Sequence, residues 1–372
     1  MFPRPGRRAA LFVGGSTLVV ACASPAAAGR TTRGWSPGSG ATRQTSEPTR
    51  TLVTDADRAM GIEWRFDAGG PLYAPPAVGV DGAVYIGTAD GYLLALDARG
   101  LVQWAYTLEG AIAWSPLVDR NGRIYVATTA QRLCSFYPNG VLGWQAKTPV
   151  HVGGELAFAS PASVAFAGTD GNVWAYAEYG SAVWHAGVGP SISAGPRYFG
   201  GRAFVASVDG SVVVLDGAMR RSVVRVPGAC DAIVGARPDG AVTLITGGAL
   251  IGVGPKGDVR FRRDGVAWAD SVGDGFIAVE HDGALTRLTS EGAVASHTPL
   301  GEEGAAAPVV APSGAVYVAG TSGVLAIVGK NGTVRRVPVA SAALHRPVLD
   351  VARRRVLVAA GSGIVASLRL ED

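Results

Sequence analysis

The chain has 372 residues, 48% of them hydrophobic, and a formal net charge of +4 at pH 7. Residues 1–50 contain seven arginines and one glutamate, a net charge of +6, so residues 51–372 carry a net charge of −2. A nucleic-acid-binding domain is expected to be basic over its folded part. This distribution therefore argues against nucleic-acid binding as the function of residues 51–372.

The first 21 residues have the features of a signal peptide of the lipoprotein type. A short basic start precedes an apolar run of 13 residues, Ala9–Ala21, which is too short to span a bilayer but has the length of a signal-peptide core. The run ends in Val19-Val20-Ala21-Cys22, which resembles the bacterial lipobox, and we expect Cys22 to be the lipidation site. Ordinary cleavage after Ala26-Ala27-Ala28 is the alternative, and it predicts a soluble periplasmic or secreted protein.

Residues 22–50 are predicted to form a flexible tether, because glycine, serine, threonine, proline and arginine dominate them and leave little to bury. Ala23 and Ser24, which follow Cys22, lack the aspartate that favours retention in the inner membrane. We therefore expect an outer-membrane lipoprotein that faces the periplasm and contacts the membrane through its lipid alone.

A repeat of 40 residues organises the rest of the chain. Four tryptophans mark it: Trp64, Trp104, Trp144 and Trp184. The last three close a Gly-x-x-x-Trp pattern, and between them short β-branched and aromatic runs alternate with Asp-Gly turns, as in hairpin-linked antiparallel strands. Four strands in a repeat of this length are typical of a β-propeller blade.

The repeat divides residues 51–372 into eight units and predicts an all-β fold, an eight-bladed β-propeller of four-stranded antiparallel blades. Later outer strands are expected at Val224, Phe261, Ser296 and Arg336, and third strands at Leu94, Cys134, Trp174 and Val214. Inner strands are expected to follow Pro76, Pro116, Pro161, Pro196, Pro308 and Pro347. Units five and six lack this proline and are the degenerate pair.

The eighth unit runs out after its third strand, at Asp372. Gly61–Trp64 at the other end of the repeats has the character of the missing outer strand. We therefore predict that an N-terminal strand completes the last blade, which closes the ring and removes an unpaired strand edge.

The segment Asp97–Trp104, preceded by VYIGTADGYLLAL, resembles the repeat of the pyrroloquinoline-quinone (PQQ) type propellers. Together with the lipobox, the tether and eight blades, it resembles most the BamB-type lipoprotein of the outer-membrane β-barrel assembly machine. The resemblance implies a monomeric, non-enzymatic scaffold whose partner is a protein, with a subunit of that machine as the candidate. The alternatives are an envelope sensor or carbohydrate- or peptide-binding propeller, and a quinoprotein-type enzyme.

The sequence does not support PQQ chemistry, and we expect no cofactor. Quinoproteins of this superfamily carry adjacent cysteines beside the cofactor, whereas the cysteines here are Cys22, Cys134 and Cys230. We expect Cys134 and Cys230 to be buried free thiols. The five histidines lack the spacing of a zinc site, so no metal is expected. Arg353–Arg355 is predicted to be a solvated turn.

Aromatic residues are the candidate partner-binding groups. Segments that link an outer strand to the next inner strand carry Tyr73, Trp114, Phe158 and His345. Such segments share one face of a propeller, and aromatic residues are enriched at interfaces. These side chains either bind a partner protein or plug the channel. The four repeat tryptophans are expected instead to dock against the neighbouring blade.

Overall fold

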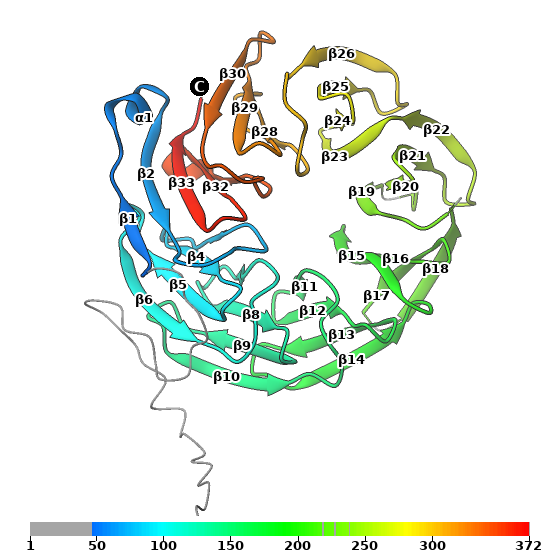
Figure 1. The fold of residues 1–372 in the computed structure, drawn as a ribbon. Coiled ribbons are helices and arrows are strands. Elements are labelled where there is room, and N and C mark those ends of the chain that lie inside the picture. The colour runs from blue at the N-terminus through cyan, green and yellow to red at the C-terminus, as the bar shows by residue number, and fades with distance from the viewer. Residues whose placement is uncertain (1–46, 218, 227, 238, 372) are drawn as a thin grey trace, which may run out of the picture.

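The structure is a computed structural model that describes residues 47–217, 219–226, 228–237 and 239–371. The strands of these residues form eight antiparallel sheets, which stand as blades around a central channel (Figure 1). Within each blade the strands follow the chain order from the channel outwards, except where the N-terminal strands join the last blade. The predicted all-β, eight-bladed propeller is confirmed.

The first four blades contain the following strands. Blade 1 comprises β3 (Ala77–Val78), β4 (Val84–Gly87), β5 (Tyr92–Leu96) and β6 (Val102–Thr107). Blade 2 comprises β7 (Leu117–Val118), β8 (Ile124–Thr128), β9 (Arg132–Phe136) and β10 (Leu142–Lys147). Blade 3 comprises β11 (Ala157–Ser160), β12 (Ser163–Ala167), β13 (Asn172–Ala177) and β14 (Ala182–Gly187). Blade 4 comprises β15 (Ile192–Phe199), β16 (Arg202–Ser207), β17 (Ser211–Asp216) and β18 (Met219–Arg225).

The other four blades complete the ring. Blade 5 comprises β19 (Ala232–Ala236), β20 (Val242–Thr246), β21 (Ala249–Val253) and β22 (Val259–Asp264). Blade 6 comprises β23 (Val266–Val272), β24 (Gly275–Glu280), β25 (Ala284–Leu288) and β26 (Val294–Pro299). Blade 7 comprises β27 (Val309–Val310), β28 (Val316–Ala319), β29 (Val324–Val328) and β30 (Val334–Pro338). Blade 8 comprises β31 (Val348–Asp350), β32 (Arg355–Ala359), β33 (Ile364–Arg369), β2 (Ile62–Asp67) and β1 (Thr49–Thr51).

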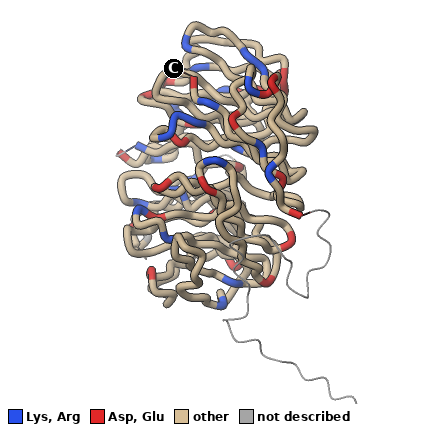
Figure 2. Tube along the Cα trace, turned by 90° about the vertical axis from the view of Figure 1, so that its left-hand side faces the viewer, with Lys and Arg blue, Asp and Glu red and all other residues tan. Residues whose placement is uncertain are grey.

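The hydrophobic core lies between neighbouring blades. Every residue of β4 and β5 is buried, because each face of these strands packs against a sheet. The outer strand β10 alternates half-buried and exposed residues, since one of its faces meets solvent. Charged residues of both signs are interspersed over the ring (Figure 2).

The predicted third-strand and outer-strand positions are confirmed, but two of the proline assignments are wrong. Pro161 lies in the turn that follows β11, and Pro196 lies inside β15, where the register shifts between Ala194 and Arg197. Proline lacks an N–H and is tolerated wherever a ladder is interrupted, which includes turns and bulges as well as strand starts. The other four prolines do precede inner strands, those of blades 1, 2, 7 and 8.

The ring closes as predicted, through the pairing of β2 with β33, in which Trp64 lies opposite Ser367. The strand β1 then pairs with the outer edge of β2 and gives blade 8 a fifth strand. The domain boundary expected after residue 50 falls inside β1. Between the two strands lies the short helix α1 (Asp55–Ala59).

Docking tryptophans join neighbouring blades. The indole N–H of Trp64 donates to Ala98 O at 3.0 Å, and that of Trp104 donates to Pro138 O at 2.8 Å. Each indole ring also packs against the glycine that lies two residues after its acceptor. For Trp64 this is Gly100 and for Trp104 it is Gly140, where a Cβ atom would come within 2.6 or 2.7 Å of the indole. The glycine of each Gly-x-x-x-Trp pattern therefore receives the tryptophan of the preceding blade.

Trp144 repeats this arrangement, with its indole N–H on Glu178 O and its ring against Gly180. Trp184 is half-buried in β14, and the residue that corresponds to Glu178, 218, lies outside the described residues.

Arg355 joins blade 8 to blade 1, and the expectation of a solvated turn at Arg353–Arg355 is wrong for this residue. Arg355 is 2% exposed. Its Nε lies 2.9 Å from Asp350 Oδ2, and its two terminal nitrogens donate to Gly82 O and Ala98 O at 2.7 and 2.6 Å. The countercharge and the two carbonyls satisfy the guanidinium, which makes its burial tolerable.

The signal peptide, residues 1–21, the lipidation site Cys22 and residues 23–46 of the tether lie outside the described residues. Among the residues that are described, no helix combines the length and the hydropathy required to cross a bilayer.

Candidate functional site

One face of the ring carries all the loops between blades. The first four strands of every blade are antiparallel, so every segment that joins a fourth strand to the next innermost strand returns to the same side. We call these segments the inter-blade loops and this side the loop face. The opposite side, the turn face, carries the turns between first and second strands and between third and fourth strands.

The inter-blade loops are held by backbone hydrogen bonds from the turn between the second and third strands. In each bond the backbone N–H of the first residue donates to the carbonyl oxygen of the second, at N–O distances of 2.9–3.1 Å. The pairs are Ala89 and Pro71, Thr129 and Ala111, Thr169 and His151, Val208 and Ser191, Thr321 and Glu303, and Gly361 and Ala343. The loop face is therefore a preorganised surface.

The structure places three of the four predicted partner-binding residues in inter-blade loops. Tyr73 is 57% exposed. Trp114 is half-buried and packs against the core between blades 2 and 3. Phe158 lies inside β11 instead, where its ring meets Tyr125 edge-on at a centroid distance of 6.1 Å. Of these aromatic side chains, Tyr73 is the most exposed, whereas Trp114 and Phe158 are half-buried.

His345 connects two inter-blade loops. Its Nε2 donates a hydrogen bond to Leu72 O at 3.0 Å, which ties the loop before blade 8 to the loop before blade 1. Burial lowers the pKa of His345 below its ordinary value, and the bond to Leu72 opposes this shift. The neutral imidazole is thus the form that fits this position.

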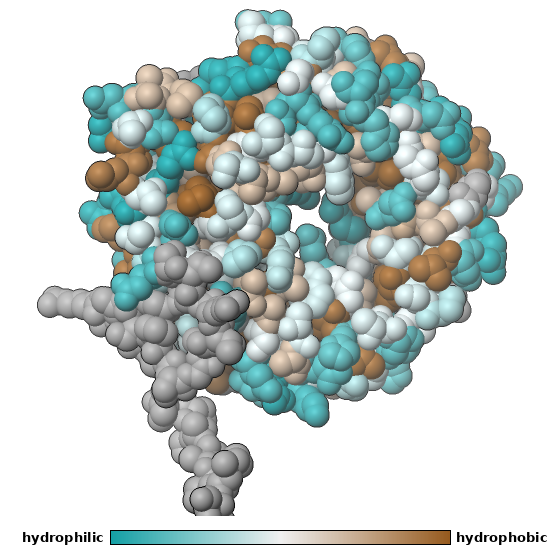
Figure 3. All heavy atoms as spheres, viewed as in Figure 1, coloured by the Kyte–Doolittle hydropathy of each residue, from teal (hydrophilic) through white to brown (hydrophobic). Residues whose placement is uncertain are grey.

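A cavity of about 380 Å³ opens on the channel side of the loop face. Its polar and aromatic lining residues are Glu155, Ser193, Arg197, Asp231, Trp268, Asp270 and Arg346. We call it the channel-mouth cavity; Figure 3 shows the central opening of the ring. The lining comes from blades 4–6 and from the loops before blades 3, 7 and 8, so it assembles only when several blades are in place.

The chemistry of the channel-mouth cavity suits binding. Arg346 forms an ion pair with Asp270 of β23. Trp268 is 38% exposed, and its indole N–H donates to Gly304 O at 3.1 Å. Ser193 Oγ is buried without a hydrogen-bond partner among the described residues. Arginine and tryptophan dominate the binding energy of many protein interfaces.

Sequence reasoning missed these residues. Trp268 lies outside the series of tryptophans spaced by 40 residues and in a degenerate unit. A tryptophan at such a position has no docking role in the repeat, and this could have marked it as a candidate binding residue. Asp270 and Arg346 are 76 residues apart in the sequence, and the curvature of the ring brings them together. No local sequence pattern could therefore predict that they form an ion pair.

The two described cysteines lie apart from each other. Cys134, in β9, and Cys230, before β19, are free and buried in different blades, as predicted. Burial raises the pKa of each thiol to about 12, which suppresses thiolate chemistry at neutral pH. Within the described part of the chain, no three histidine, cysteine or acidic side chains gather as metal ligands.

Part of the chain matches a known sequence family. The family described as "Outer membrane protein assembly factor BamB" matches residues 49–176, from β1 to the third strand of blade 3. No curated protein sequence matches the chain.

Several solved propellers share the fold. BamB from Moraxella catarrhalis is 19% identical, with 82% of this chain and 84% of that chain covered and a TM-score of 0.51. Sqt1 from Saccharomyces cerevisiae is 13% identical over 82% and 97% of the two chains, with a TM-score of 0.69. Virginiamycin B lyase from Staphylococcus aureus is 12% identical over 81% and 95%, with a TM-score of 0.51. At such low identities the likeness shows the fold alone.

Proposed function

We propose that this chain, a PQQ-type β-propeller that resembles BamB, is a non-enzymatic scaffold that binds a protein partner through its loop face. In this proposal, lipid on Cys22 anchors the protein to the outer membrane, and the propeller faces the periplasm as a monomer. Its partner belongs to the machinery that assembles outer-membrane proteins.

The observation that carries the proposal is the loop face itself. Hydrogen bonds hold its loops, which lowers the entropy that a partner must remove on binding. Exposed Tyr73 lies on it, and Trp268 and Arg346 line the channel-mouth cavity. Aromatic and arginine anchors beside a cavity are typical of the centre of a protein interface.

A pull-down of the tagged, full-length protein from its own membranes in mild detergent tests the proposal. We expect a large β-barrel assembly subunit to copurify in a stoichiometric amount. Trp268→Ala and Tyr73→Ala should each reduce its recovery by about tenfold, as loss of an interface anchor does. Tyr179→Ala is the matched control, because Tyr179 is 72% exposed but lies on the turn face.

Equal recovery with all three variants would contradict a binding role for the loop face. Thermal unfolding of each variant separates lost binding from lost folding. Trp114→Ala is a poorer probe, because Trp114 packs against the core and its truncation also costs stability.

The anchor is tested separately with Cys22→Ser. We expect this variant to leave the membrane fraction, and we expect mass spectrometry of the wild-type protein to find lipid on an N-terminal Cys22. A mature chain that begins after Ala28 would replace the anchored scaffold by a soluble periplasmic or secreted protein.

A propeller that binds a sugar or a peptide is the alternative that one observation favours. The channel-mouth cavity, at about 380 Å³, lies within the size range of small-ligand pockets. Native mass spectrometry of the purified protein distinguishes the two functions, since a retained small molecule supports the alternative. Tight binding of PQQ or a metal in the same measurement would support an enzyme.

A further inference from the structure

Two aromatic side chains fill the turn-face side of the cleft between regular blades. In blade 1, Tyr85 lies 5.9 Å from Trp104, measured between ring centroids. In blade 2, Tyr125 lies 6.2 Å from Trp144. In each pair the tyrosine belongs to the second strand and the tryptophan to the outer strand of the same blade.

Blade 5 has lost both of these side chains. Its second strand follows Asp239-Gly240-Ala241-Val242, the same pattern as Asp81-Gly82-Ala83-Val84 in blade 1, but Thr243 stands where Tyr85 would be. In the outer strand, Phe261 takes the tryptophan position. Phe261 lies against Gly292 of blade 6, where a Cβ atom would come within 2.5 Å of its ring, so it docks as the tryptophans do.

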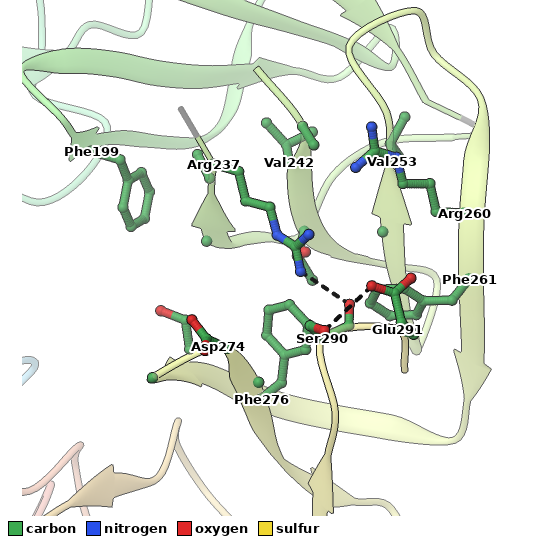
Figure 4. A pocket seen from close by; sticks show the side chains of 18 residues that line it. Phe199, Arg237, Val242, Val253, Arg260, Phe261, Asp274, Phe276, Ser290 and Glu291 are labelled. Atoms are coloured by element: carbon green, nitrogen blue, oxygen red, sulfur yellow. Dashed lines mark hydrogen bonds between the residues drawn. The ribbon is translucent and has the colours of Figure 1, made fainter. Parts of the chain in front are cut away.

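A cavity of about 500 Å³ occupies the cleft between blades 5 and 6, beside these two substitutions. The residues that matter for its chemistry are Phe199, Arg237, Thr243, Phe261, Asp274 and Phe276. Figure 4 shows the side chain of Arg237 extending between Phe199 and Phe276 towards Ser290. The cavity is thus bounded by aromatic rings, the guanidinium groups of Arg237 and Arg260, and the carboxylates of Asp274 and Glu291.

The carbonyl that receives a docking indole is still present in this cleft. Ala98 and Pro138, the acceptors for Trp64 and Trp104, each lie two residues before the docking glycine. Ser290 lies two residues before Gly292 and is their equivalent. Its carbonyl accepts a bond of 3.3 Å from Arg237 Nη2. An arginine has thereby taken over the hydrogen bond that an indole makes in the regular blades.

We propose that this cleft binds the side chain of a tyrosine or tryptophan from an extended segment of a partner polypeptide. The ring would lie where the second-strand tyrosine lies in blades 1 and 2. Phe261 and Phe276, whose centroids are 5.7 Å apart, would contact it, and Arg237 would lie over or beside it, in position for a cation–π contact.

The surroundings of the cleft favour a polypeptide over a free aromatic compound. A hollow of about 240 Å³ shares Phe199 and Arg237 with the cavity, and another of about 340 Å³ shares Asp274 and Phe276 with it. The three hollows form a row across blades 4–6 on the turn face. This row extends well beyond a single ring, and it lies opposite the loop face, so the site is independent of the function proposed above.

The test uses the full-length protein in detergent micelles and the tripeptides acetyl-Gly-X-Gly-amide, with X as tyrosine, tryptophan or leucine. Binding is followed by saturation-transfer NMR. We expect the two aromatic peptides to bind and the leucine peptide to bind about tenfold more weakly, because it lacks a ring for the aromatic lining. Equal binding of all three peptides, or binding of p-cresol but of no peptide, would overturn the proposal.

Variants that refill the cleft from within provide the second arm. Thr243→Tyr restores the missing tyrosine, and Phe261→Trp restores the indole. We expect each to weaken binding of the tyrosine peptide by about tenfold while it raises the melting temperature. Thr243→Val, which removes the hydroxyl without filling the cleft, should bind as the wild type does. Unchanged binding in a folded Thr243→Tyr or Phe261→Trp protein would contradict the assignment.

A photoreactive peptide, acetyl-Gly-benzoylphenylalanine-Gly-amide, gives a measurement on the wild-type protein that does not depend on the variants. Crosslinks mapped by mass spectrometry should fall in β22 or in the turn between β23 and β24. Crosslinks confined to other blades would refute the site, whereas the pull-down through the loop face would be unaffected.

Discussion

Arg355 shows how a charged side chain is accommodated inside this ring. Its guanidinium contacts Asp350 in its own blade and two carbonyls of blade 1, so each of its three nitrogens has a hydrogen-bond partner. A sequence of three successive arginines is ordinarily solvent-exposed. Composition could not reveal that the third of them is buried, because its partners come from the first blade, more than 250 residues earlier.

We expect Arg355→Ala to lower the free energy of unfolding by about 3 kcal/mol, because it breaks the buried ion pair with Asp350 Oδ2 and leaves Arg353, 3.5 Å from Asp350 Oδ1, as the remaining cation. Chemical denaturation measures this change. Arg99→Ala is the control: Arg99 pairs with Asp97 at the surface, and its loss should cost under about 1 kcal/mol. Similar losses for both variants would show that Arg355 is not a buried contact between blades.

Asp57 gives the N-terminal segment a dependence on pH. The backbone N–H of Thr54, followed by Arg65, lowers the pKa of Asp57 to about 2, and burial opposes this shift. The folded pKa lies below the ordinary value of 3.8, so the carboxylate stabilises the fold above about pH 4, and this contribution is lost as the pH falls towards 2.

We therefore expect Asp57→Asn to be less stable than the wild type at pH 7, with a difference that shrinks as the pH falls from about 4 towards 2. Melting temperatures across this range test the expectation, with Asp55→Asn, at a fully exposed carboxylate, as the control. A constant difference between wild type and Asp57→Asn at every pH would argue against an ionised Asp57 in the fold.

At the scale of the elements, the repeat explains why most strands could be located from the sequence. Outer strands were found even at Phe261 and Ser296, where the tryptophan is missing, because the turns on either side keep their spacing. Proline was a weaker guide, since Pro161 and Pro196 mark interruptions of a ladder rather than its beginning.

The candidate site was predicted less completely than the strands. Tyr73 was found from its place between strands, whereas the channel-mouth cavity depends on side chains that meet only when several blades are in place. Asp270 and Arg346 belong to blades on either side of blade 7, and local patterns carry no information about such a meeting.

The docking glycines give a prediction that separates steric clash from backbone strain. Gly140 and Gly332 both have a φ of +82°, but a Cβ atom at Gly140 would lie 2.7 Å from the ring of Trp104, whereas one at Gly332 would meet nothing within 4 Å. Both alanine variants should lose about 1 kcal/mol to backbone strain.

Gly140→Ala should lose a further 1–3 kcal/mol, roughly the cost of overpacking, as the indole of Trp104 is displaced. Urea denaturation, with tryptophan fluorescence as the probe, measures both variants. Equal losses would mean that the indole can move aside and that close docking is not what requires the glycine.

At the scale of the whole molecule, stability depends on strands from the two ends of the described chain. Deletion of residues 47–53 removes β1 and leaves β2 on β33, so we expect a monomer with little change in melting temperature. Deletion of residues 47–67 also removes β2 with Trp64, which exposes the edge of β33 and should cause aggregation. Size-exclusion chromatography and thermal unfolding compare the two. A monomeric, equally stable second variant would show that the N-terminal strand is dispensable for closure.

The pairing of β2 with β33 also determines the order in which the blades can form. Ser367 and Glu63, which bond across this junction, are 304 residues apart, so β2 is among the first strands synthesised and its partner among the last. Blades 1–7 can form while the chain is still emerging, because their strands are neighbours in sequence. Blade 8 must wait for β33. Throughout that interval β2 is an unmatched strand that a chaperone, or another copy of the nascent chain, has the opportunity to engage.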